Sequence, residues 1–302
     1  MFDFKQRVHN YFNYILNEQR KKTLFDLHST KLRYSALTSK EMGTCKTQYY
    51  SDQTQVIVSL TTYGLRIFDV YLTIESLLNQ TFPPNRILLW LSEEEKGNDL
   101  PELLLKQQRR GLEIMYYKDI LSYKKLIPSL KLFPNDVIIT VDDDVIYTVD
   151  ALEFLIKSSK ANPNCICANW CMRIKLNHTG IPKSYGLWDS IGITEKPSKL
   201  NFPIGCAGVL YPPHCLSDHV FDESTFMNIC KFADDIWFKA MALMNGSNSI
   251  MTTHNAHEFM YYDNPLWQDM GLTPKNIKLD MNDTQFKAVL DNYNLYTKLA
   301  AE

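Results

Sequence analysis

Apolar runs alternate with helix-like segments through the middle of the chain, and this alternation limits the possible folds more than any other feature. Four mainly apolar runs each have the length of one strand: residues 55–60, 86–91, 112–117 and 137–141. Between them, apolar residues recur at three- and four-residue spacing, as along one face of a helix. Strands that alternate with helices predict a parallel sheet joined by right-handed crossovers. We therefore predict an α/β fold with a mixed, mostly parallel sheet flanked by helices.

The fourth run ends in three consecutive carboxylates, Asp142, Asp143 and Asp144. Like charges at the end of a buried strand repel one another and resist desolvation. A divalent cation would relieve that cost, because hard cations bind carboxylate oxygens. The alternative is an acidic turn that ends the strand in water, since Asp is common in turns. His254 and His257 are further candidate metal ligands, although a lone histidine more often has a structural role.

Ligands of such sheets bind beyond the carboxyl ends of the strands, and the triple aspartate stands there. The segment Thr61-Thr62-Tyr63-Gly64-Leu65-Arg66 also stands there, after the first run. No Gly-x-Gly-x-x-Gly follows that run, and the sequence contains no Gly-Lys-Ser/Thr loop, which argues against a dinucleotide dehydrogenase and a P-loop enzyme. A bound diphosphate would instead be held through a metal on the aspartates.

Two further motifs lie in the second half of the sequence. Gly205 and Gly208 bracket a small pair of residues, so the backbone could approach a ligand closely or make a tight turn. Asp234 and Asp235 fall in the first turn of an expected helix. There they either complement the helix dipole or provide a general base beside an apolar sugar face.

Charge and cysteine content argue against several classes of protein. The net charge of −2 gives no electrostatic footprint for nucleic acid. Seven cysteines include no Cys-x-x-Cys pair, so neither a zinc ribbon nor a thioredoxin-type site is indicated, and a reducing compartment fits. No apolar stretch approaches the roughly 20 residues that span a bilayer, and the N-terminus lacks the core of a secretory signal. We expect a cytoplasmic protein.

The N-terminus predicts an amphipathic helix over residues 1–22, with a basic end. Its apolar residues at helical spacing are Phe4, Val8, Tyr11, Phe12 and Ile15. This helix could pack on its own domain or on a second subunit of a homo-oligomer. Alternatively, it could make a peripheral contact at the inner face of a membrane. Residues 23–53 are polar and predict an irregular linker.

The chain resembles a GT-A-fold glycosyltransferase, nearest the family-2-like group of bacterial enzymes that build surface polysaccharides. Four motifs carry the resemblance in order over about residues 54–260: Ser59-Leu60-Thr61-Thr62-Tyr63, Asp142-Asp143-Asp144 as the Asp-x-Asp motif, Gly205-Cys206-Ala207-Gly208, and Ala233-Asp234-Asp235 in the place of the acceptor motif. The resemblance implies a Rossmann-like GT-A domain over 54–265, with a nucleotide-sugar half (54–150) and an acceptor half (151–265). An N-terminal extension (1–53) precedes it, and a C-terminal helical extension (266–302) follows.

The resemblance also implies the reaction and the residues that perform it. A single sugar would move from a nucleoside-diphosphate sugar, with a UDP-sugar favoured, to a hydroxyl of a glycan or lipid-linked acceptor, with inversion by analogy. Asp235 would be the base, with Asp234 as the alternative. Asp142 and Asp144 would hold Mn²⁺ or Mg²⁺, which neutralises the leaving diphosphate. The nucleotide-sugar pocket would include Thr61, Tyr63, Arg66, Asp142, Asp143, Gly205 and Gly208, with Lys124 or Lys125 adding positive charge.

Some features limit the resemblance, and two other functions remain open. The Gln-x-x-Arg-Trp motif of processive members is absent, which favours transfer of one sugar over polymerisation. A catalytically silent GT-A domain could serve as a binding or scaffold subunit in a glycan-assembly complex, although all the expected carboxylates are present. A metal-dependent nucleotidyltransferase or phosphohydrolase would use the same aspartates but release pyrophosphate or phosphate.

Overall fold

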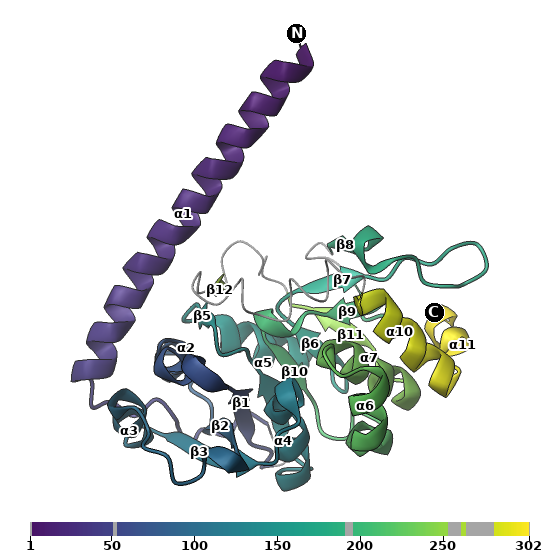
Figure 1. The fold of residues 1–302 in the computed structure, drawn as a ribbon. Helices are drawn as coiled ribbons and strands as arrows, with labels where there is room; N and C mark the ends of the chain where they lie inside the picture. The colour runs from purple at the N-terminus through teal and green to yellow at the C-terminus, as the bar shows by residue number, and fades with distance from the viewer. Residues whose placement is uncertain (1, 51–52, 191–195, 253–260, 264–280, 302) are drawn as a thin grey trace.

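The computed structural model describes residues 2–50, 53–190, 196–252, 261–263 and 281–301. Within these residues, seven strands form one sheet in the order β11-β6-β10-β4-β1-β2-β3 (Figure 1). Neighbouring strands run parallel except at β10, which lies antiparallel between β4 and β6. The predicted mixed, mostly parallel sheet is therefore confirmed. The strands are β1 (Val56–Thr61), β2 (Arg86–Ser92), β3 (Leu112–Tyr117), β4 (Val137–Thr140), β6 (Ile166–Ala168), β10 (Val209–Tyr211) and β11 (Ser249–Met251).

Alternate residues of the strands supply two hydrophobic cores, one on each face of the sheet. In β1, Val56 and Val58 enter one core, whereas Ile57 between them enters the other. This follows from the two-residue period of a strand, and it explains why the strands are apolar throughout. The first core is covered by α1 (Phe2–Thr38), α2 (Val70–Leu78), α3 (Glu102–Gln108) and α5 (Ala151–Ala161). The second is covered by α4 (Ile127–Leu132), α6 (Glu223–Ile229), α7 (Asp234–Asn245), α10 (Met281–Tyr293) and α11 (Tyr296–Ala300).

Two small sheets lie beside the large one. The first pairs β5 (Val145–Tyr147) with β12 (Tyr261–Asp263), directly after the triple aspartate. The second joins β7 (Cys171–Arg173), β8 (Asp189–Ser190) and β9 (Asn201–Pro203) in the order β8-β7-β9. Both therefore follow the carboxyl ends of main-sheet strands, β4 for the first and β6 for the second.

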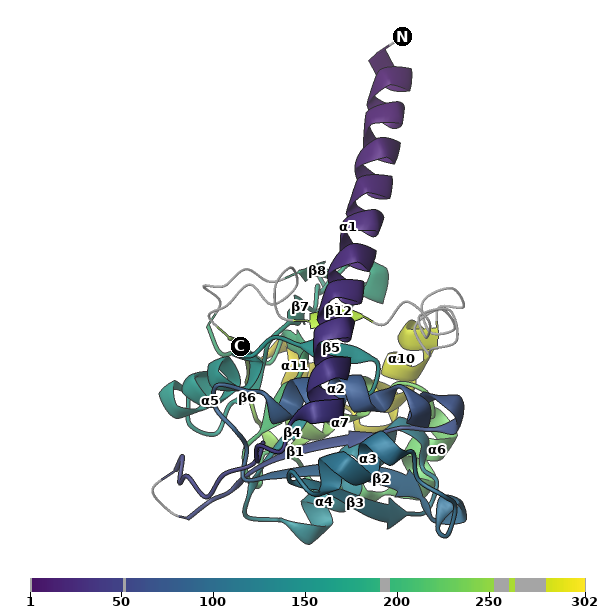
Figure 2. The ribbon, with the colours of Figure 1, turned by 90° about the vertical axis from the view of Figure 1, so that its left-hand side faces the viewer.

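The N-terminal helix is longer than the sequence predicted. α1 continues to Thr38, so the prediction of an irregular linker from residue 23 is wrong for residues 23–38. The reason is tertiary packing, because Phe25 and Ala36 are buried against the body and hold this polar segment in a helix. Figures 1 and 2 show that the first part of α1 projects away from the body. Within the part of the chain that the structure describes, no helix is both long and apolar enough to cross a membrane.

Candidate active site

The triple aspartate forms the turn between β4 and β5, and its central carboxylate points inward. Asp143 is buried and accepts hydrogen bonds from Thr62 Oγ1 at 2.6 Å and Arg66 Nη1 at 2.6 Å. Burial raises the pKa of Asp143, whereas Arg66 and Thr62 oppose that rise by stabilising the charged form. Thr73 on α2 also donates to the backbone carbonyl of Asp143. Asp143 therefore ties the loop after β1 to the acidic turn.

The two outer carboxylates of the turn are more exposed and face cationic side chains. Asp142 contacts Lys125 Nζ at 2.9 Å, and Asp144 contacts Arg66 Nη2 at 3.2 Å. Their side chains are 32% and 23% exposed, so both can present oxygen to a divalent ion from solution. No group of three or more acidic, His or Cys side chains within the described ranges is arranged to hold a metal alone. The donor set therefore fits an ion shared with a diphosphate, not one enclosed by protein ligands.

Lys125 joins the two halves of the site. It belongs to the short 3-10 helix Leu121–Lys125, and its Nζ lies 2.9 Å from Asp142 and 3.0 Å from Asp234 on α7. Burial alone would lower the pKa of Lys125, but Asp142, Asp234 and Asp235 outweigh it and raise the pKa well above its ordinary value. A permanently charged lysine thus holds the acidic turn beside the first turn of α7.

Asp235 is the carboxylate of α7 that reaches the Gly205 loop. Its Oδ2 accepts a hydrogen bond from the Gly205 backbone N–H at 2.9 Å. A Cβ on Gly205 would lie 2.5 Å from Asp235 Oδ1, so this approach requires glycine. Burial raises the pKa of Asp235 to about 7; Lys125 opposes the rise, while Asp234 and Asp142 add to it. Near pH 7 this group can exist both as a base and as its conjugate acid.

Tyr147 connects the acidic turn to the Gly205 loop, a role that the sequence did not reveal. Its hydroxyl accepts a hydrogen bond from the Asp142 backbone N–H at 2.9 Å and donates to the Cys206 carbonyl at 2.7 Å. The side chain comes from β5, and no motif marks it in the sequence. Its only signal is an aromatic residue in a strand that directly follows the aspartates.

The remaining predicted residues divide between the site and the scaffold. Thr61 donates to the Trp90 carbonyl at 2.8 Å, so its hydroxyl joins β1 to β2. Tyr63 is 54% exposed, and its ring lies 5.2 Å from the Arg66 guanidinium carbon, so it borders the acidic turn. Lys124 pairs with Asp119 at 2.5 Å instead of joining Lys125.

Gly208 and the two histidines differ from the rest of the predicted set. Gly208 has a φ of +94°, and the nearest atoms to an added Cβ belong to Leu155, Asn169 and Thr140. The positive φ suits the turn before β10, and the prediction that Gly208 also borders the nucleotide-sugar pocket stays a prediction. His254 and His257 lie outside the described residues, so their prediction as metal ligands stays a prediction.

Comparisons with known proteins find similarity among solved structures. No protein-family model matches the chain, and neither does any curated protein. Among solved structures, S. aureus TarS residues 1–349 is similar at 13% identity and a TM-score of 0.45, covering 79% of this chain and 66% of that chain. A second S. aureus TarS structure is similar at 17% identity and a TM-score of 0.47, covering 72% of this chain and 38% of that chain. TarS 1–349 in complex with UDP gives 13% identity, a TM-score of 0.44, and coverages of 79% and 66%. This chain thus spans less than two thirds of each TarS chain.

Proposed function

We propose that the protein is a metal-dependent glycosyltransferase of the GT-A type. It would transfer one sugar from a nucleoside-diphosphate sugar, with a UDP-sugar favoured, to a hydroxyl of a glycan or lipid-linked acceptor. The observation that carries the proposal is the position of Lys125, whose Nζ contacts a carboxylate of the acidic turn and a carboxylate of α7. Segments far apart in sequence thereby contribute acids to one place beyond the carboxyl ends of the strands, where ligands of such sheets bind.

The donor would bind over the loop after β1 and the acidic turn. Arg66 and Lys125 supply fixed positive charge there, and Asp142 and Asp144 would hold Mn²⁺ or Mg²⁺ together with the diphosphate. When bound, such an ion supplies Lewis-acid stabilisation of the negative charge that develops on the departing diphosphate. Asp143 keeps its scaffold role, because its oxygens are already engaged by Thr62 and Arg66.

The acceptor hydroxyl would lose its proton to Asp235. Asp234 is paired with Lys125, whereas Asp235 Oδ1 is not the oxygen engaged by the Gly205 N–H. A carboxylate with a pKa near 7 accepts a proton more readily than an ordinary aspartate does. As the proton moves to Asp235, the acceptor oxygen forms a bond to the anomeric carbon, and the bond from that carbon to the diphosphate breaks. Attack from the opposite face would invert the anomeric configuration.

The first experiment is a screen of nucleotide sugars for release of nucleoside diphosphate, without an acceptor and then with candidate glycans. Release of UDP, GDP or another nucleoside diphosphate supports the proposal. Release of pyrophosphate or phosphate would instead indicate a nucleotidyltransferase or phosphohydrolase.

The melting temperature with and without UDP and Mn²⁺ separates binding from turnover. A ligand that binds only the folded protein raises this temperature in proportion to its occupancy. Stabilisation by UDP and Mn²⁺ without turnover of any donor would indicate the silent scaffold subunit. No stabilisation by any nucleoside diphosphate, with no turnover, would refute the transferase proposal.

A further inference from the structure

Helix α2 is buried along its whole length, whereas a helix that covers a sheet ordinarily keeps one face in water. Its apolar side chains pack in the core on the sheet, and α1, α3 and β5 contact the rest of it. Three polar side chains, Thr73, Glu75 and Ser76, are nevertheless buried in this helix. Buried polar groups need hydrogen-bond partners, and the partners of these three lie in two different parts of the protein.

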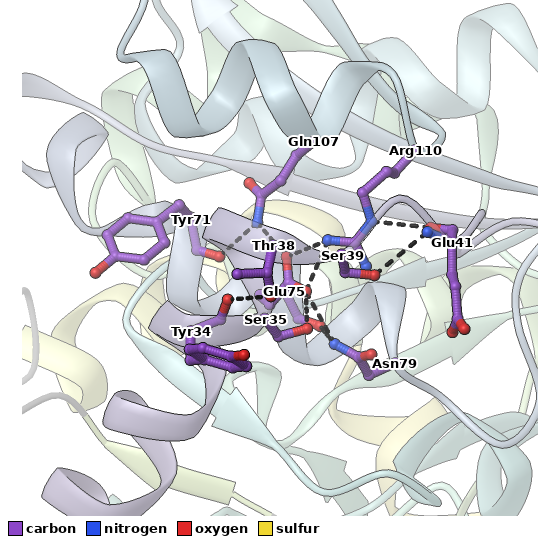
Figure 3. A network of polar contacts seen from close by, with 10 residues as sticks. All are labelled: Tyr34, Ser35, Thr38, Ser39, Glu41, Tyr71, Glu75, Asn79, Gln107 and Arg110. Carbon is purple, nitrogen blue, oxygen red and sulfur yellow. Dashed lines mark hydrogen bonds and ion pairs between the residues drawn. The ribbon is translucent and has the colours of Figure 1, made fainter.

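One side of α2 is fixed by a buried network around Glu75 (Figure 3). Glu75 accepts hydrogen bonds from Arg110 Nη1 at 2.7 and 2.8 Å, Gln107 at 2.9 Å and Ser35 of α1 at 2.7 Å. Gln107 also donates to the Tyr71 carbonyl at 2.8 Å. Groups from α1, α3 and the turn after α3 therefore share one carboxylate of α2. Because a buried charge cannot leave its partners without a large cost, this network fixes the rotation of α2 about its axis.

A second polar face of α2 meets the acidic turn and β5. Thr73 Oγ1 donates to the Asp143 carbonyl at 2.9 Å. The Tyr147 backbone N–H donates to Ser76 Oγ at 3.1 Å, while the Ser76 hydroxyl donates to the Thr73 carbonyl at 2.6 Å. Thr73 and Ser76 are three positions apart, so they share one face of the helix, and Glu75 lies on a different face. The rotation that the Glu75 network fixes therefore also directs these two hydroxyls at the turn.

The contacts of α2 reach the backbone of two of the three aspartates. Thr73 holds the carbonyl of Asp143 directly. Ser76 holds the backbone of Tyr147, and the hydroxyl of that tyrosine accepts a hydrogen bond from the Asp142 backbone N–H at 2.9 Å. The backbone from which the side chains of Asp142 and Asp144 project is therefore fixed to α2.

The placement of this backbone matters for any ligand that bridges the two outer carboxylates. Asp142 and Asp144 are partly exposed side chains on a turn, so the distance between their oxygens depends on the turn's backbone. Groups that orient the ligands of a metal contribute roughly 10- to 100-fold to its affinity. Thr73 and Ser76 have the position of such orienting groups, although no motif marks them in the sequence.

We propose that Thr73 and Ser76 are positioning residues of the donor site, and that they hold the acidic turn so that Asp142 and Asp144 can share one divalent ion with the diphosphate. This inference rests on the proposed glycosyltransferase function, which assigns the turn to the donor. Neither hydroxyl would touch the donor, because both are engaged by the backbone. Loss of either should weaken donor binding and leave proton transfer to Asp235 intact.

Donor affinity tests the proposal with two variants and a matched control. Thr73→Val and Ser76→Ala remove the hydroxyls without adding volume. Ser129→Ala removes another buried serine hydroxyl, which contacts Ser59 and Trp90 at the other face of the sheet. In calorimetry with Mn²⁺, we expect UDP affinity to fall about tenfold in both α2 variants and to stay unchanged in Ser129→Ala.

Steady-state kinetics separate positioning from catalysis in the same variants. The KM for the donor should rise in Thr73→Val and Ser76→Ala, while kcat at saturating donor stays near the wild-type value. Wild-type UDP affinity in both α2 variants, or an equal loss in Ser129→Ala, would overturn the proposal.

Amide hydrogen exchange tests the position of the turn without any donor. Removing either α2 hydroxyl should speed exchange at the backbone amides of residues 142–147, whereas Ser129→Ala should leave their exchange unchanged. If the wild-type protein neither binds nor transfers any nucleotide sugar, the proposed function fails, and the exchange result alone decides whether α2 holds the turn. Unchanged exchange of these amides in both α2 variants would overturn the positioning role.

Discussion

The raised pKa of Asp235 leads to a quantitative prediction for the pH dependence of transfer. The group must be ionised to accept a proton from the acceptor, and its pKa is about 7. About nine tenths of it is therefore ionised at pH 8 and about one tenth at pH 6. We expect kcat, at saturating donor and acceptor, to fall about tenfold between these values. An aspartate with an ordinary pKa near 4 would give a flat profile in this range.

Substitutions identify the group behind this change. Asp235→Asn removes the base and should lower kcat by roughly 10²–10⁴-fold while leaving UDP affinity unchanged. Asp234→Asn is the matched control, because it neutralises the adjacent carboxylate. We expect it to keep most of the turnover, with the fall in kcat at low pH moved to lower pH, because the charge of Asp234 contributes to the raised pKa of Asp235. Lys125→Met removes the cation that opposes the raised pKa of Asp235. The fall in kcat at low pH should therefore move to higher pH.

Steady-state kinetics from pH 5.5 to 9, with donor affinity measured separately by calorimetry, provide the assay. A flat wild-type profile between pH 6 and 8 would contradict the raised pKa of Asp235. Near-wild-type turnover by Asp235→Asn would show that another group is the base. Loss of turnover in Asp234→Asn alone would transfer that role to Asp234.

Three other substitutions test separate parts of the structure. Asp144→Ala should abolish Mn²⁺-dependent UDP binding, measured by calorimetry, without lowering the melting temperature. Undiminished metal-dependent binding would show that Asp144 is not a metal ligand. Gly205→Ala should displace the Asp235 carboxylate and lower kcat by about 10²-fold in a protein that still folds. An unchanged kcat would show that the close approach of Gly205 to Asp235 is dispensable for turnover. Arg110→Met leaves the Glu75 carboxylate buried and unpaired, so we expect the free energy of unfolding, measured with urea, to fall by about 3–5 kcal/mol. Adding Glu75→Gln should recover much of that loss. A fall of less than about 1 kcal/mol would show that the ion pair is not needed for stability.

The parts of the fold that depend on local pattern were predictable from the sequence. β3 spans Leu112–Tyr117 as predicted, β2 and β4 differ from their predicted bounds by one residue at one end, and β1 is shifted by one residue at both ends. Buried strands are apolar on both faces, so composition locates them with little help from the rest of the chain. The length of α1 was harder to predict, because residues 23–38 are mostly polar and only a few of them pack against the body.

The site was predictable in its residue types but not in its connections. The three aspartates and the pair on α7 stand out in the sequence, yet nothing in it says that Asp143 turns inward while its neighbours face cations. Lys124 and Lys125 are equivalent in sequence, and only the 3-10 helix decides that Lys125 reaches Asp142. The contact between Lys125 and Asp234 spans over a hundred positions and depends on how α7 packs.

The position of β10 has a consequence for synthesis on the ribosome. Strands β3, β2, β1 and β4 come from residues 56–140 and pair only with one another, except that one edge of β4 waits for Val209–Tyr211. Until those residues emerge, that edge of β4 has no strand beside it, and exposed edges of apolar strands invite pairing with other chains. A nascent chain that stalls before residue 209 should therefore be prone to aggregation. It would also display the three aspartates without the α7 carboxylates, so donor contacts could form before the proposed base, Asp235, is in place.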